Sequence, residues 1–179
     1  MNKEPNNSQR VAVFMDAQNL YHTAKRVFNR KVNFGAILDT AIMGRGLVRA
    51  IAYVIKTEEG DEAAFVEALH KTGIETRIKD LIIFSNGSKK ADWDVGMAID
   101  AVSIAPKVDV VTLVTGDSDF VPLVEYLRMH GVRVELLSFG NSTATKLIES
   151  VDEYVDLAED ERKFLLAAPR RRGVFKKKK

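Results

Sequence analysis

Short apolar runs alternate along the chain with stretches in which apolar residues recur every three or four positions. The runs are rich in β-branched residues, and we expect buried strands at residues 10–16, 47–55, within 74–84, 108–114 and 132–138. The stretches between them predict helices at residues 17–28, 34–43, between Asp61 and Gly73, 92–104, between Asp117 and Gly131, and 142–150. This alternation predicts an α/β fold, a three-layer α/β/α arrangement with a mostly parallel five-stranded sheet.

Three segments refine this pattern. Residues 74–84 are long enough for a strand with a hairpin-like extension. Residues 151–158 are acidic and weakly apolar, and they fit either a further strand or a turn. Helical spacing in the segment 92–104 predicts an inner face made of Val95, Ala98, Ile99 and Val102.

Charge is unevenly distributed along the chain. The 179 residues carry 27 basic and 25 acidic side chains. Seven of the basic residues follow Pro169, so the other 20 face 25 acids and the body of the chain is acidic. We expect a disordered leader at 1–9, one domain at 10–160 and a basic, flexible tail at 161–179. The tail fits a nucleic-acid arm or a solvated end equally well.

The composition excludes several kinds of site and location. The chain has no cysteine, which removes disulfides, thiolate metal sites and cysteine nucleophiles. No apolar run approaches the roughly 20 residues of a membrane span. Residues 1–8 are polar, unlike a secretion signal. We therefore expect a cytoplasmic protein that does not contact a membrane.

Four acids stand near the predicted ends of strands or the starts of helices. Asp16 ends the first strand, Asp117 and Asp119 follow the fourth, and Asp94 stands near a helix start. If strands one and four are neighbours, their carboxyl ends meet where the strand order reverses. Carboxylates that converge repel one another, so such a cluster usually holds a divalent cation. Oxygen ligands favour Mg²⁺ or Mn²⁺ over zinc, and these ions activate water for attack on a phosphodiester.

Other polar residues near these acids have both a functional and a structural interpretation. Asn19 lies one helical turn after the first acid and fits a supporting amide or a simple cap. Asp92 fits a helix cap better than a ligand, and Asp100 fits a solvent-exposed or paired acid as well as a ligand. Thr115 and Ser118 are additional candidates that fit best as residues holding their loop. A helix cap also explains part of this loop, but one cap does not need so many polar residues.

Three motifs occur in order along the chain. They read VFMDAQNL at 13–20, KADWDVGMAID at 90–100 and TGDSDF at 115–120. Together they resemble the NYN domain, and more narrowly its bacterial LabA-like branch within the PIN-like nuclease superfamily. The resemblance spans about residues 10 to 157.

This resemblance implies a parallel sheet of order 3-2-1-4-5 with an acidic site at the carboxyl ends of its strands. It also implies a ribonuclease that uses Mg²⁺ or Mn²⁺ and acts on single-stranded or structured RNA. By position, Asp16, Asp94 and Asp117 match the metal-binding acids. Asp119 matches the fourth acid and Asn19 the supporting amide.

Basic and aromatic residues are candidates for contact with RNA. Phosphate contacts position a strand without reading its sequence. Tyr21 and Trp93 fit base stacking, although packing within the fold is the commoner role of such aromatics. The basic candidates are Lys25, Lys89, Lys90, Arg170, Arg171 and Arg172, with Arg26 and Arg30 beside Lys25.

Three functions compete on the sequence alone. The first is a metal-dependent ribonuclease that hydrolyses RNA phosphodiester bonds. The alternative is a non-catalytic RNA-binding or regulatory module that retains the acidic metal site. A phosphatase is disfavoured because Asp16 is followed by Ala17 and Gln18, which leaves no Asp-x-Asp nucleophile pair on the first strand. A homodimer is a candidate assembly.

Overall fold

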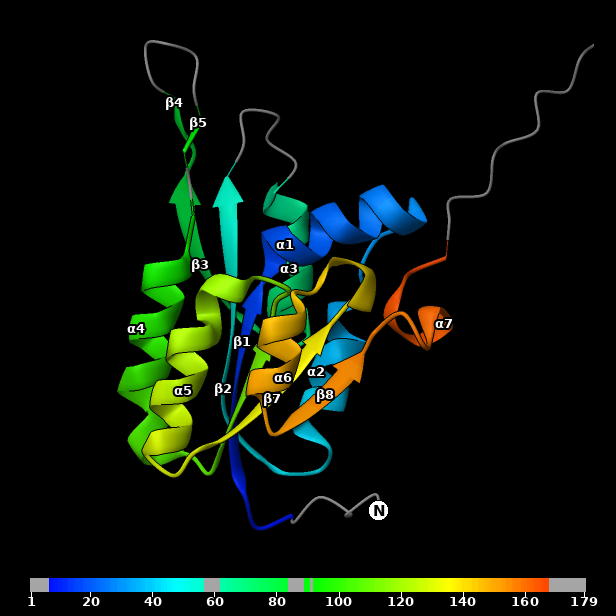
Figure 1. Ribbon diagram of the computed structural model, residues 1–179. Coiled ribbons are helices and arrows are strands. Elements are labelled where there is room, and N and C mark those ends of the chain that lie inside the picture. The colour runs from blue at the N-terminus through cyan, green and yellow to red at the C-terminus, as the bar shows by residue number, and fades with distance from the viewer. Residues whose placement is uncertain (1–6, 57–61, 84–88, 91, 168–179) are drawn as a thin grey trace, which may run out of the picture.

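The computed structural model describes residues 7–56, 62–83, 89–90 and 92–167, with the backbone alone for 82–83 and 89–90. In this part of the chain, one main sheet lies between two layers of helices, and a separate two-stranded ribbon stands beside it (Figure 1). None of the described helices has the length and apolar character needed to cross a membrane.

The main sheet is entirely parallel, in the order β3-β2-β1-β6-β7-β8. Counted along this sheet alone, the order is 3-2-1-4-5-6, which confirms the expected α/β fold and the 3-2-1-4-5 order. The extra strand is β8, so residues 151–158 contain a strand rather than only a turn. The six strands are β1 (Arg10–Asp16), β2 (Gly46–Lys56), β3 (Glu75–Asp80), β6 (Val110–Val114), β7 (Arg133–Ser138) and β8 (Glu153–Asp156).

Helices follow the strands at the predicted places. The hairpin-like extension after the third strand is also present, since β4 (Ile82–Ile83) pairs antiparallel with β5 (Lys89–Lys90). The described residues also contain three short 3₁₀ turns: η2 (Ala105–Lys107), η3 (Ser118–Phe120) and η4 (Gly140–Ser142). The helices are α1 (Ala17–Thr23) with its π-helical continuation η1 (Ala24–Phe28), α2 (Phe34–Ile42), α3 (Glu62–Lys71), α4 (Asp94–Ile104), α5 (Val121–Met129), α6 (Thr145–Ser150) and α7 (Glu161–Phe164).

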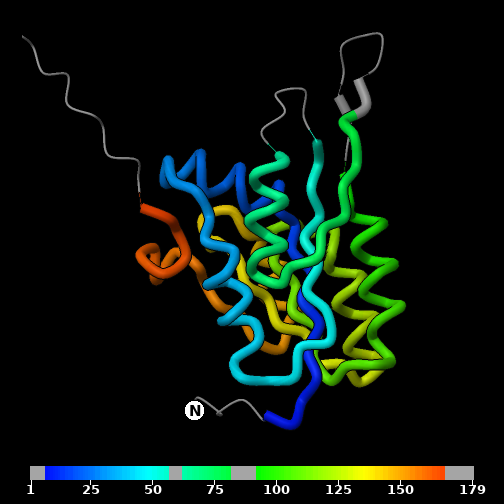
Figure 2. Tube along the Cα trace, turned by 180° about the vertical axis from the view of Figure 1, so that it is seen from behind, coloured from blue at the N-terminus to red at the C-terminus, as the bar shows by residue number. Residues whose placement is uncertain are grey.

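The two layers form two apolar cores, one on each face of the sheet. The helices α1, α2, α3 and α7 cover one face, and Figure 2 shows this layer from the side opposite to Figure 1. The helices α4, α5 and α6 cover the other face. The central strands β1 and β6 are buried on both faces, which is why they are continuous apolar runs rather than alternating ones.

The predicted inner face of α4 is wrong for Val95 and Ile99, whereas Ala98 and Val102 do pack against the core. Val95 and Ile99 are 69% and 60% exposed, whereas Met97 and Ala101 are fully buried. Both sets have helical spacing, so the sequence pattern does not distinguish them. The start of the helix decides between them: the Trp93 ring packs on the Tyr53 ring with centroids 5.4 Å apart, and its Nε1 donates to the Val54 carbonyl. This anchor turns the adjacent stripe of α4 toward the sheet.

The first residues of the segment predicted as a tail lie against the domain. Phe164 and Leu165 are buried in the core that contains α2, and Leu165 forms an isolated bridge with Val32. The Arg30 guanidinium donates to the carbonyls of Leu165 and Leu166. Residues 168–179, and residues 1–6 of the predicted leader, lie outside the described part of the chain.

Candidate active site

A cleft of about 570 Å³ opens at the carboxyl ends of the central strands. It lies where β1 has β2 on one side and β6 on the other, which is the point at which the strand order reverses. Open α/β sheets form their ligand sites at this position. The residues that line it come from the β1–α1 junction, the loop after β6, the start of α4 and η4.

Two hydrogen bonds join the junction after β1 to the loop after β6. The Asp16 carboxylate caps α1 and accepts from the backbone N–H of Asn19 at 3.0 Å. The Asn19 amide oxygen in turn accepts from the Gly116 N–H at 3.1 Å. A side chain at Gly116 would not fit, because a Cβ there would lie 2.4 Å from the Ser142 carbonyl oxygen. Asn19 is therefore placed to hold this loop against the first strand.

The loop after β6 combines a cap with an exposed acid. The Asp117 carboxylate accepts from the backbone N–H of Asp119 at 3.0 Å and so caps η3. The buried Thr115 hydroxyl accepts from the Asp117 N–H at 3.3 Å, as expected for a residue that holds the loop. Ser118 is exposed. Since a carboxylate has two oxygens, Asp117 can cap the helix with one and offer the other to a ligand.

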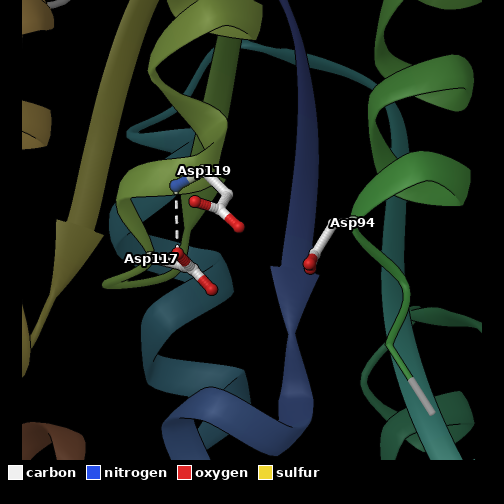
Figure 3. Close-up of side chains that lie close together, drawn as sticks. All are labelled: Asp94, Asp117 and Asp119. Carbon is white, nitrogen blue, oxygen red and sulfur yellow. Dashed lines mark hydrogen bonds between the residues drawn. The ribbon is translucent and has the colours of Figure 1, made fainter. Parts of the chain in front are cut away.

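The start of α4 brings a third acid to this loop. Asp94 is the first residue of α4, and Figure 3 shows its carboxylate pointing toward Asp117 and Asp119. One oxygen from each of these three residues lies within 4.8 Å of the other two. Asp16 lines the same cleft outside this group of three. Asp119 is the most exposed of the three and does not line the cleft itself.

The carboxylates in this cleft affect one another's titration. Burial, together with the charges of Asp117 and Asp16, raises the pKa of Asp94 to about 6. Burial also raises the pKa of Asp16, against the hydrogen bond from Asn19 that lowers it. Among the described residues, no basic side chain forms an ion pair with any acid of the cleft. The site is therefore a concentration of uncompensated negative charge.

This donor set fits a hard divalent cation. The three grouped acids offer carboxylate oxygens from separate elements at distances that one ion can bridge. Mg²⁺ and Mn²⁺ prefer such oxygen ligands, whereas zinc prefers nitrogen and sulfur. The cation would also remove the repulsion among the carboxylates.

Similarity to known proteins identifies the family to which this chain belongs. Residues 10–158 match the NYN domain family, which is most of the chain. The chain belongs to the NYN domain family. It is also similar to a curated relative, the low amplitude and bright protein LabA of Synechococcus elongatus, with 29% identity over 171 residues and 87% of each chain covered. The LabA-like resemblance of the motifs is thereby confirmed.

One solved structure matches this NYN domain closely. It is the crystal structure of a protein of unknown function from Vibrio parahaemolyticus, which is 32% identical to this chain. The match covers 92% of this chain and all of the other, with a TM-score of 0.81. The fold neighbour therefore supports the architecture over nearly the whole domain.

Two weaker acidic candidates of the NYN domain have different surroundings. Asp92 is not the cap of α4, because Trp93 takes that position and makes no side-chain cap bond. Asp92 lines the cleft instead. Asp100 does not line the cleft: it accepts from the Tyr53 hydroxyl at 2.9 Å and pairs with Arg77 at 3.4 Å. Its structural interpretation, an acid with a basic partner, agrees with these contacts.

The basic candidates are only partly described. Lys25 directs its ammonium to Tyr21, with Nζ 5.5 Å from the ring centre, and does not line the cleft. Lys89 and Lys90 belong to β5, whose side chains are outside the described part, and Arg170, Arg171 and Arg172 are outside it entirely.

One wall of the cleft was predicted only through Arg26, as a basic candidate beside Lys25, and its other residues were missed. Gln18, His22 and Arg26 line it from α1 and η1, and Ser142 lines it from η4. The signal was available for the helical residues, since they are spaced four positions apart and so share one face. Ser142 carried no such signal, because η4 follows a different strand.

Proposed function

We propose that this NYN domain is a metal-dependent ribonuclease. The observation that carries the proposal is the convergence of Asp94, Asp117 and Asp119 within 4.8 Å, without a basic partner among the described residues. Acids that stabilise a fold are normally paired or solvated, whereas Asp94 and Asp117 line a cleft at the ligand-binding end of a parallel sheet and Asp119 lies beside them. Family membership supports RNA as the substrate.

In this proposal, Asp94 and Asp117 hold Mg²⁺ or Mn²⁺, with Asp16 from the cleft wall and Asp119 from the rim completing the acidic set. The ion supplies an activated water and charge neutralisation at the phosphodiester. The protein supplies the positions of the ligands. Asn19 fixes the loop after β6 through Gly116, and Thr115 fixes the backbone of the residue that caps η3.

The proposal is tested by cleavage of a labelled single-stranded RNA in Mn²⁺ or Mg²⁺. Asp117→Asn removes a metal-binding charge at nearly constant volume, so we expect the rate to fall by about 100-fold or more, since metal catalysis is worth several kcal/mol. Asp39→Asn is the matched control, because Asp39 is an exposed acid on α2 away from the cleft. It should cleave like the wild type.

The outcomes separate the two functions that the sequence left open. Activity that survives in Asp117→Asn would mean that the cleavage does not come from this site. Binding of RNA with no turnover in any divalent ion would overturn the ribonuclease and favour the non-catalytic module. Release of phosphate from an aryl phosphate, with RNA left intact, would favour a phosphatase.

A further inference from the structure

The wall of the cleft opposite the acids is built from one stripe of a helix. Gln18, His22 and Arg26 line the cleft from α1 and η1, and the side chains of Gln18 and His22 contact each other at 3.1 Å. Next to Arg26, η4 contributes Ser142. The cleft therefore has an acidic side and a side with neutral and basic groups.

Arg26 lies in a π-helical segment of this wall. In a regular α-helix of 3.6 residues per turn, side chains four apart drift by about 40° at each step. The segment Ala24–Phe28 is π-helical, and a π-turn takes more residues than an α-turn. The wider turn acts against this drift, and His22 and Arg26 both line the cleft. Single π-turns of this kind are frequent at functional sites.

Arg26 differs from most of the other described arginines in what it contacts. Seven of the nine arginines in the described part of the chain form an ion pair with a carboxylate. Arg26 lines a cleft rich in acids, yet it donates a hydrogen bond to the Ser142 hydroxyl, with Nη2 2.9 Å from Oγ. A guanidinium has five N–H donors, so this bond leaves most of them for a bound group.

We propose that Arg26 binds a backbone phosphate of the RNA strand, and this rests on the proposed ribonuclease function. A guanidinium matches the geometry of phosphate oxygens and forms charge-assisted hydrogen bonds with them. Because the guanidinium is itself positively charged, it does not bind a metal ion. Arg26 therefore contributes to the affinity for RNA and not to the affinity for metal. Ser142 acts as a positioning residue that holds the guanidinium at the cleft.

The first test measures RNA affinity by fluorescence anisotropy, in EDTA so that no cleavage occurs. Arg26→Gln should weaken binding by about 10- to 100-fold, the range of a hydrogen bond to a charged group. The adjacent Lys25→Gln removes the same charge from a side chain directed at Tyr21 and should weaken binding by less than about 3-fold. Arg26→Lys should recover part of the loss, because lysine keeps the charge and loses the fork.

The salt dependence of binding separates a phosphate contact from a general effect on the fold. Each phosphate contact to single-stranded nucleic acid contributes about 0.7 to the slope of log affinity against log salt. Arg26→Gln should lower that slope by this amount, and Lys25→Gln should leave it unchanged. The proposal would be overturned if both variants lost the same amount of RNA affinity. It would also be overturned if Arg26→Gln left the slope of log affinity against log salt unchanged.

A second measurement assigns the effect to substrate rather than metal. Titration of Mn²⁺ without RNA should give the same affinity for Arg26→Gln and wild type, and in the cleavage assay the variant should show a raised KM. An altered Mn²⁺ affinity would contradict the assignment. If the wild type cleaves no RNA, the ribonuclease fails, while the affinity and salt results still decide the role of Arg26.

Discussion

Two regions of the molecule contain acids that are fully or partly buried, and only one of these regions gives its acid a basic partner. Glu135 on β7 is buried and accepts two hydrogen bonds from the buried Arg45, at 2.8 and 2.7 Å. Arg45 precedes β2, toward the amino ends of the strands. At the carboxyl ends, the acids of the cleft face one another and have no ion pair among the described residues.

The titration of the two groups reflects this difference. Burial alone would raise the pKa of Glu135, but hydrogen bonds and charge from Arg45 and then Arg133 outweigh it and lower the pKa. Stability from Glu135 is therefore present above about pH 4.5 and is lost as the pH falls. The raised pKa of Asp94 has the opposite sign: the folded state loses stability as the pH rises from about 4 to about 6.

The contrast separates acids that stabilise the fold from acids kept for a ligand. Where the fold needs a buried charge, it supplies a partner with good geometry, as Arg45 does for Glu135. In the cleft, the carboxylates repel one another, and a bound cation would reduce this repulsion. Perturbed acids that gather in a cleft without a partner are typical of functional sites.

The largest effect is expected from breaking the buried pair. Glu135→Gln leaves the Arg45 guanidinium buried without its counter-charge, so we expect unfolding to require about 3 to 5 kcal/mol less free energy. Urea denaturation measures this. Glu153→Gln is the matched control, because Glu153 pairs with Arg133 at the surface and should cost less than about 1 kcal/mol.

A double variant sharpens this result. Replacing both Arg45 and Glu135 by Met removes the pair without leaving a single buried charge, so the loss should be smaller than for Glu135→Gln alone. If the urea midpoint of unfolding were the same for Glu135→Gln and the wild type, the stabilising role of the pair would be contradicted.

An intermediate effect is expected when a divalent ion relieves the repulsion in the cleft. At about 100 times its dissociation constant, Mn²⁺ should stabilise the protein by about 2.7 kcal/mol. For a chain of this length, that raises the Tm by about 5 to 10 °C, and EDTA should reverse it. Asp117→Asn should abolish the rise. The same rise in Asp117→Asn would show that the ion acts elsewhere.

The smallest effect is expected from neutralising one cleft acid in the absence of metal. Asp94→Asn cannot ionise, so it avoids the cost that the raised pKa of Asp94 imposes on the wild type at neutral pH. Because this side chain is partly exposed, we expect a gain of about 1 kcal/mol above pH 6 after allowance for solvent screening. The gain should vanish near pH 4. A variant less stable than the wild type at pH 7 would contradict the repulsion.

The sequence was sufficient for the sheet and for the place of the acids. Strand runs, turn residues and helical spacing predicted five parallel strands, and the places of Asp16 and Asp117 follow from where such strands end. Asp94 lies at a helix start and was proposed as a metal ligand from the family resemblance. The contacts that depend on tertiary packing were not predictable in this way. The inner stripe of α4 depends on where Trp93 packs, and the partners of Asp100 come from β2 and β3.

The missed cleft wall has two further physical causes. The wall includes a π-helical turn at Ala24–Phe28, and helical spacing alone does not reveal such a turn. Arg26 was therefore grouped with Lys25 and Arg30, although Lys25 contacts Tyr21 and Arg30 contacts the segment after α7. Ser142 is brought close by the packing of η4 against Gly116.

The central claim, that the acids of the cleft bind a catalytic divalent ion, is tested most directly by an anomalous-scattering map from crystals soaked in Mn²⁺. The account predicts an anomalous peak in contact with the carboxylates of Asp94 and Asp117, with Asp16 or Asp119 as a further ligand. The peak should be absent from crystals of Asp117→Asn prepared in the same way. A cleft without a peak in the wild type, or a peak that Asp117→Asn does not remove, would contradict it.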